Sequence, residues 1–225
     1  MPLAVADDTL YAVGGLSGQS FVPESTLWAY REDMNRWEAR APLPSPRGAS
    51  GAAAVRDRLV VVGGWGPGRR LVDSTAIYDP AANRWRNAAP MPTPRDHLAA
   101  AAIAGLVYAI GGRPLDPDRN YAVVEAYDLA TDRWTRKATM PSRRGGLAAA
   151  VLDGIIHTVG GETRHAVFAN HEVYDPVTDR WSVAPPLPTA RHGLGAAALA
   201  DKLYVIGGGP AAGFAQTDAV AVFRP

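Results

Sequence analysis

The sequence predicts an all-β protein made of five repeated units of four short strands, and three observations support this prediction. Pairs of glycines recur along the 225 residues at spacings of 47 to 49 residues. Tryptophans, single aromatic residues and Pro-x-x-Arg motifs recur with the same period. The 23 glycines and 19 prolines suit many short strands joined by turns, and 47% hydrophobic residues suffice for a core.

Four types of marker define the repeat. The glycine pairs are Gly14-Gly15, Gly63-Gly64, Gly111-Gly112, Gly160-Gly161 and Gly207-Gly208. The tryptophans are Trp37, Trp85, Trp134 and Trp181, and the single aromatics are Tyr30, Tyr78, Tyr127, Tyr174 and Phe223. The arginines, each three residues after a proline, are Arg47, Arg95, Arg144 and Arg191. Four markers with one period indicate a tandem repeat.

The second repeat shows the order of its elements. Strand A is the small-residue run Gly51 to Val55, and strand B is the apolar run from Leu59 to the glycine pair. Strand C covers Ala76 to Asp79, and strand D carries Trp85. The same reading places strands A at 98–103, 147–152 and 194–199, strands B at 106–111 and 155–160, and strands C at 125–128 and 172–175. Small side chains on strand A allow several sheets to crowd around one axis, and the glycine pair permits positive φ where strand B ends.

The order of double glycine, Tyr-Asp, Trp and Pro-x-x-Arg at a period near 50 residues resembles the kelch repeat, whose sheets form the blades of β-propellers. The resemblance covers the whole chain. It implies a single kelch-type propeller domain, 1–225, with repeats at approximately 1–46, 47–94, 95–143, 144–190 and 191–225. Kelch propellers include both interaction modules and enzymes, so the fold alone does not fix the function.

The last repeat stops after strand C, at Phe223 to Pro225, and has no Trp-bearing strand. We therefore expect a five-bladed ring whose last blade has three strands. A fragment of a larger propeller, or a ring completed by another chain in a homo-oligomer, is the alternative.

Composition excludes several classes of function. A net charge of +1 argues against a nucleic-acid partner, and no apolar run is long enough to span a membrane. The absence of cysteine excludes disulfides, thiolate metal sites and a cysteine nucleophile. No signal peptide is recognisable at the N-terminus, so a cytoplasmic location is favoured. We expect no cofactor and no metal site.

The loops between strands B and C and between strands D and A share one face, here called the B–C/D–A face. These loops differ from repeat to repeat and are rich in arginine, which prefers carboxylate and phosphate partners. The predicted partner is therefore a protein or acidic peptide, or an anionic small molecule. The repeating arginines are interpreted as architectural, and Trp65 is expected to be exposed. The candidate ligand-binding residues are Trp65, Arg69, Arg70, Arg113, Arg119, Tyr121, Arg164, His165 and Phe168.

Four polar residues on the same face are catalytic candidates: Asp96, His97, Glu162 and His192. They suit an acid–base pair at the mouth of the channel, although no recognised metal-ligand spacing is present. Among kelch-type enzymes, oxidases that resemble galactose oxidase need a Cys–Tyr crosslink that this chain cannot form. An activity similar to sialic-acid mutarotase is permitted. The first hypothesis is a binding module. The second is an isomerase or mutarotase, lyase or hydrolase, and the third is a component of a larger assembly that completes the last blade.

Overall fold

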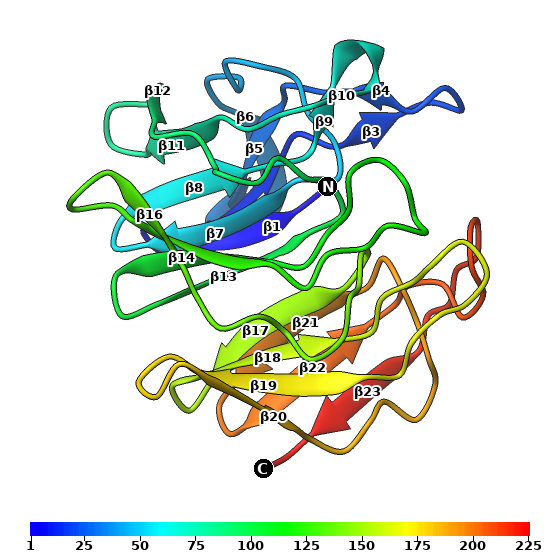
Figure 1. Ribbon diagram of the computed structural model, residues 1–225. Coiled ribbons are helices and arrows are strands. Elements are labelled where there is room, and N and C mark those ends of the chain that lie inside the picture. Colours follow the sequence, from blue (N-terminus) through cyan, green and yellow to red (C-terminus); the bar gives the residue numbers. More distant parts are fainter.

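The structure is a computed structural model that describes all residues 1–225, folded as five antiparallel sheets arranged around a channel (Figure 1). Each sheet is one blade. Blade 1 contains β1 (Leu3–Ala6), β2 (Thr9–Val13), β5 (Leu27–Arg31) and β6 (Arg36–Ala39). Blade 2 contains β7 (Gly51–Val55), β8 (Arg58–Val62), β11 (Thr75–Asp79) and β12 (Arg84–Ala88). Blade 3 contains β13 (Ala99–Ile103), β14 (Leu106–Ile110), β15 (Val124–Asp128) and β16 (Arg133–Arg136).

Blade 4 contains β17 (Ala148–Leu152), β18 (Ile155–Val159), β19 (His171–Asp175) and β20 (Arg180–Val183), and blade 5 contains β21 (Gly195–Leu199), β22 (Lys202–Ile206) and β23 (Val220–Phe223). The five-bladed all-β fold and the three-stranded last blade are therefore confirmed. Two short hairpins in the B–C loops were not predicted: β3 (Leu16–Ser17) with β4 (Val22–Pro23), and β9 (Trp65–Gly66) with β10 (Arg70–Leu71). The two helical segments are single 3-10 turns, Glu32–Met34 and Pro67–Arg69, and neither they nor any other helix could span a bilayer.

The glycine pairs permit close contact between successive repeats. Gly63 and Gly64 have φ of 62° and 92°, in the region that favours glycine. The N–H of Gly64 donates to the carbonyl oxygen of Arg95 at 2.9 Å, and a Cβ on Gly63 would lie 2.6 Å from the same oxygen. A side chain at this point would push the two repeats apart.

The repeating arginines are buried inside the blades rather than offered to a ligand. Arg95 donates to the carbonyl oxygens of Gly111 and Ala109 and forms an ion pair with buried Glu125 at 2.6 Å. Arg144 repeats this arrangement with Glu172 at 2.7 Å. Burial lowers the pKa of Arg47 to about 10. The architectural interpretation of these arginines is confirmed, since each one bonds carbonyl oxygens where a loop joins its blade.

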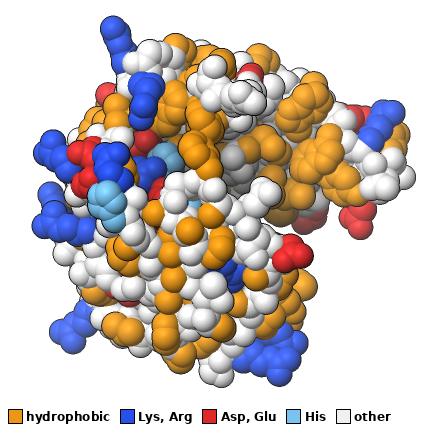
Figure 2. All heavy atoms as spheres, turned by 90° about the vertical axis from the view of Figure 1, so that its right-hand side faces the viewer, with side chains coloured by type: hydrophobic (Ala, Val, Ile, Leu, Met, Phe, Trp, Pro, Cys, Tyr) orange, Lys and Arg blue, Asp and Glu red, His pale blue; other side chains and the backbone are white.

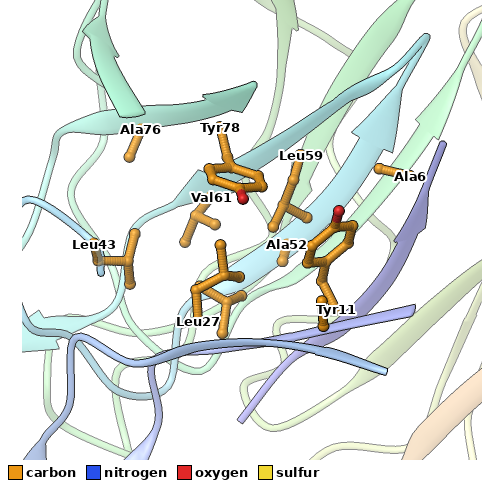
Figure 3. Packing of buried hydrophobic residues seen from close by; sticks show 11 residues of the cluster. Ala6, Tyr11, Leu27, Leu43, Ala52, Leu59, Val61, Ala76 and Tyr78 are labelled. Atoms are coloured by element: carbon orange, nitrogen blue, oxygen red, sulfur yellow. The ribbon is translucent and has the colours of Figure 1, made fainter. Parts of the chain in front are cut away.

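The core consists of separate apolar layers between neighbouring blades. Between blades 1 and 2, Tyr11 and Tyr78 meet edge to face at 5.6 Å between ring centroids, with Leu27 and Leu59 packed beside them (Figure 3). The inner strands β1, β7, β13, β17 and β21 pack side by side in that order, and small residues on them make this close packing possible.

A pair of hydrogen bonds recurs at the outer edge of the first three blade junctions. Ala41, four residues after Trp37, donates its N–H to Asn83 Oδ1 at 3.0 Å and accepts from Trp85 Nε1 at 2.7 Å. The same bonds join Ala89 to Asp132 and Trp134, and Ala138 to Asp179 and Trp181. The next blade thus satisfies both backbone groups of this alanine.

Replacing Trp85 with phenylalanine is expected to lower the free energy of unfolding by about 1–2 kcal/mol, because the Ala41 carbonyl loses its donor. The matched change Trp37→Phe is expected to cost less than about 0.5 kcal/mol, since Trp37 is 43% exposed and its indole N–H has no partner. Urea unfolding of both variants measures the difference. Equal losses would contradict this account of the junction.

No comparable sheet packing joins blade 5 to blade 1, and no apolar layer contains residues of both. The two blades approach through their B–C loops, where the rings of Phe21 and Phe214 stack at 5.5 Å. The ring of five blades is therefore not closed by sheet-to-sheet packing.

Candidate ligand-binding face and channel mouth

The residue after four of the five glycine pairs sits at one end of the channel, where its backbone pairs with the residue after a repeating arginine. These pairs are Gly48 with Trp65, Asp96 with Arg113, Gly145 with Glu162, and His192 with Gly209. Five of the candidate residues predicted from the sequence thus lie in one ring of paired backbone segments: Trp65, Asp96, Arg113, Glu162 and His192.

Inside that ring, four residues are linked in series by backbone hydrogen bonds. These residues, here called the channel mouth, are Ala49, His97, Gly146 and Gly193. The N–H of His97 donates to Ala49, that of Gly146 donates to His97, and that of Gly193 donates to Gly146, at 2.7–2.8 Å. All four residues have φ between 51° and 68°. Behind them lies a cavity of about 650 Å³, lined mainly by alanine, glycine and leucine of the inner strands.

Three charged or titratable side chains meet beside the channel mouth. The Oε1 of Glu162 lies 3.1 Å from Arg113 Nη1, and its Oε2 lies 3.3 Å from His192 Nδ1. Glu162 is only 7% exposed, and the N–H of Gly213 lies 3.4 Å from the same Oε2. Arg113, Glu162 and His192, with Asn120 described below, are called the Glu162 cluster.

Asp96 and His97 form a second pair, with 3.0 Å between Asp96 Oδ2 and His97 Nδ1. Asp96 is buried and also accepts from the N–H of Leu115, while the His97 ring is partly exposed and lines the channel. The four catalytic candidates therefore come together as two pairs. No group of three or more His, Asp or Glu side chains is placed to hold a metal ion.

The expectation that Trp65 is exposed is wrong, since this residue is only 8% exposed. It lies in the paired ring next to Gly48, and the hairpin β9–β10 folds back so that Arg69 lies 5.8 Å from the centre of its ring. Arg113 is buried as well, at 8% exposure, and its charge is directed to Glu162. Neither side chain projects freely from a loop.

The remaining ligand-binding candidates occupy three kinds of position. Arg70, Arg119 and His165 are exposed and form no ion pair. Arg164 is exposed but bonds to Asp118 at 2.7 Å, which lowers the pKa of that carboxyl. Tyr121 and Phe168 are half-buried at equivalent places, where the backbone N–H returns to the second glycine of the pair.

Asn120 belongs to the site and was missed from the sequence. Its Nδ2 donates to the carbonyl oxygen of Glu162 at 2.6 Å, it is 6% exposed, and its Oδ1 has no partner. Gly145 leaves the necessary room, because a Cβ there would lie 2.8 Å from Asn120 Oδ1. The one signal in the sequence is that glycine stands at 145 where neighbouring repeats carry Asp96 and His192.

Comparisons with known proteins agree with this architecture. A family model described as the KLHDC2/KLHL20/DRC7 Kelch-repeats domain matches residues 2–208. Kelch-like protein 13 of Mus musculus, Bos taurus and Homo sapiens is 34% identical over 83 residues, which are 34% of this chain and 13% of those proteins. The matched part thus spans about an eighth of the length of these curated relatives.

The solved structure of YjhT superposes with a TM-score of 0.81 at 15% identity, over 98% of this chain and 79% of that chain. At this level of identity, the likeness concerns the fold.

Proposed function

The chain belongs to the kelch-repeat family, and we propose that it is a binding module whose B–C/D–A face takes an acidic segment of a partner protein. The supporting observation is a set of arginines on this face that are exposed and form no ion pair: Arg69, Arg70, Arg119 and Arg143. Guanidinium groups that are not already paired offer forked donors to carboxylates, and each such bond contributes more than a neutral one.

The cluster around Glu162 suits this role as a rigid centre. Its charges are balanced internally by Arg113 and, when protonated, by His192. The free positive charge therefore lies on the surrounding loops. An acidic segment would lie across these loops, with the half-buried rings of Tyr121 and Phe168 as apolar contacts.

The double change Arg70→Gln/Arg119→Gln is expected to weaken binding of a fluorescein-labelled hexaglutamate peptide by about tenfold, because two charge-assisted contacts are lost. Fluorescence anisotropy measures the affinity. The matched control is Arg84→Gln/Arg133→Gln, two exposed and unpaired arginines at the C–D turns of the opposite face. The same loss in the control, or no loss in either, would contradict the proposal.

A second candidate function, an isomerase or mutarotase, lyase or hydrolase, is favoured by one observation. Glu162 is almost fully buried and within reach of both a cation and an imidazole at the edge of the channel. This is an arrangement suited to proton transfer. Exchange NMR of the anomers of a carboxylated sugar tests it. Acceleration by the protein that is lost in Glu162→Gln but kept in Arg70→Gln/Arg119→Gln would place the enzyme hypothesis first.

A further inference from the structure

The faces of blades 1 and 5 that border the gap in the ring carry large exposed apolar side chains. On blade 1 these are Leu3, Val5, Trp28 and Trp37, which are 38–59% exposed. On blade 5 they are Leu199, Ile206, Val220 and Val222, which are 49–69% exposed. Figure 2 looks onto the side of the molecule where the B–C loops gather, and hydrophobic side chains surround a hollow there.

The same positions are covered in the interior blades. Trp28 aligns with Ala76 of blade 2, which is fully buried against blade 1, and Val222 aligns with Ile77, which is buried against blade 3. The repeat therefore places an apolar side chain at each of these positions to meet a neighbouring blade, and at the gap that neighbour is missing.

Blade 1 also retains the groups that receive a preceding blade. In the interior junctions, an Asn or Asp of the C–D turn and the Trp of strand D bind the N–H and C=O of one residue in the blade before. Blade 1 has both groups. Asn35 accepts from Tyr30 as Asn83 does from Tyr78, and Trp37 packs on Tyr30 at 5.3 Å as Trp85 packs on Tyr78 at 5.1 Å.

In blade 1, however, no residue of another blade bonds to either Asn35 or the Trp37 indole. The junction between blades 4 and 5 differs, because its own residues satisfy it. The equivalent of Ala41 is Pro185, which has no N–H, and its carbonyl oxygen accepts from His171 Nδ1 of the same blade at 3.0 Å. Blade 4 thus needs no Trp from blade 5. Blade 1, by contrast, presents both Asn35 and Trp37, and no backbone group of another blade bonds to either side chain.

We propose that the gap between blades 1 and 5 is a docking site for one further kelch-type blade, supplied by a partner protein, whose last strand delivers a backbone N–H and C=O to Asn35 and Trp37. The size of the occupant follows from the solved YjhT structure. The five repeats of this chain superpose on 79% of the YjhT chain, so the remaining fifth of that chain corresponds in length to about one further repeat. Its faces must be apolar, because both walls of the gap are.

The probe is a polypeptide of residues 81–143 of this chain, which holds one strand D followed by the four strands of blade 3. In this probe, the N–H of Ala138 would donate to the Asn35 side chain, and the carbonyl oxygen of Ala138 would accept from the Trp37 indole N–H. Added to the full chain, it is expected to form a one-to-one complex by light scattering and to reduce the fluorescence of the apolar dye ANS. Trp37→Phe should weaken this binding by about tenfold, through loss of one buried hydrogen bond, while the exposed control Val177→Ser, on a C–D turn away from the gap, should not.

A second protein covers the case in which the probe does not fold alone. The same segment is fused after Pro225, and the fusion is expected to be a monomer with lower ANS fluorescence and a thermal midpoint raised by about 5 °C. In the fusion, but not in the parent chain, Trp37→Phe should lower the midpoint. A soluble monomeric fusion with unchanged ANS fluorescence and no effect of Trp37→Phe would overturn the proposal. A fusion recovered only as aggregate would also count against it, because a fitting blade covers apolar surface.

Discussion

Replacing Arg95 with methionine is expected to lower the free energy of unfolding by about 3–5 kcal/mol, the largest effect of any substitution proposed for this protein. Arg95 is fully buried, and its guanidinium bonds to Glu125, Gly111 and Ala109. Methionine fills much of the same volume, so the loss comes from polar groups rather than from a cavity. The Glu125 carboxylate would remain buried without its cation, and the carbonyl oxygens of Thr93, Ala109 and Gly111 would each lose a donor.

Guanidinium chloride unfolding measures this effect. The control Arg133→Met alters an exposed arginine in β16 that forms no ion pair and is expected to change stability by less than about 0.5 kcal/mol. Adding Glu125→Gln to Arg95→Met should recover part of the loss, because the uncompensated charge is then removed. A loss below about 1 kcal/mol for Arg95→Met would mean that Glu125 finds water or another cation.

Acidification from pH 7 to pH 5 is expected to destabilise the protein through a buried histidine pair between blades 4 and 5. His157 Nδ1 and His171 Nε2 lie 2.8 Å apart, and His171 Nδ1 lies 3.0 Å from the carbonyl oxygen of Pro185. In the arrangement that satisfies both bonds, His171 donates to Pro185 and accepts from His157, so the His171 ring is neutral. Phe223 of blade 5 packs edge-on against His171, at 4.8 Å between ring centroids.

Burial, reinforced by the neighbouring ring of His171, lowers the pKa of His157 to about 4, and burial also lowers the pKa of His171. Of the charged neighbours, Arg144 lowers the pKa of His171 further, while Asp153 opposes the shift at His157. An unfolded histidine takes up its proton near pH 6.5, whereas folded His157 does so only near pH 4. The unfolded state therefore binds more protons in this window, and stability falls as the pH falls from about 6.5 to about 4.

The expected loss between pH 7 and pH 5 is about 1–2 kcal/mol, because pH 5 lies about 1.5 units below the pKa of an unfolded histidine and each unit corresponds to about 1.4 kcal/mol. Urea unfolding at the two pH values measures it, and the variant His157→Phe should show a smaller difference than the parent chain. An identical pH dependence in both proteins would mean that other groups cause the acid sensitivity.

The sequence predicted the blades well because their markers have local physical causes. Small residues on strand A and the glycine pair recur in all five units, and the Trp of strand D recurs in the first four, so their period is visible without coordinates. The strand limits differed by one or two residues, as for the strand expected at 98–103 and found at Ala99–Ile103. The gap between blades 1 and 5 was not predictable, since curvature of the ring is set by packing summed over all the blades.

The candidate site was predicted less completely. The sequence placed Glu162, His192 and Arg113 on one face, but their mutual contacts depend on backbone pairing between repeats. The sequence predicts an exposed Trp65 because this residue belongs to a variable B–C loop. Trp65 occupies the same position in its repeat as Arg113 and Glu162 do in theirs. The backbone pairing that holds this position between repeats is visible only in the structure.

The series of backbone hydrogen bonds at the channel mouth has a consequence for which substitutions such a protein can accept. Each residue of the channel mouth is held by backbone hydrogen bonds and has a positive φ. Its side chain therefore contributes little to the bonds that fix its position. His97 shows that a large polar side chain is accommodated, while Gly193 has open space where a Cβ would be. Asparagine and aspartate tolerate this backbone conformation best among residues with side chains. A single substitution at Gly193 therefore adds a new polar group at the channel mouth, next in the chain to His192, without disturbing any blade. This makes the channel mouth a natural point for new specificities to arise.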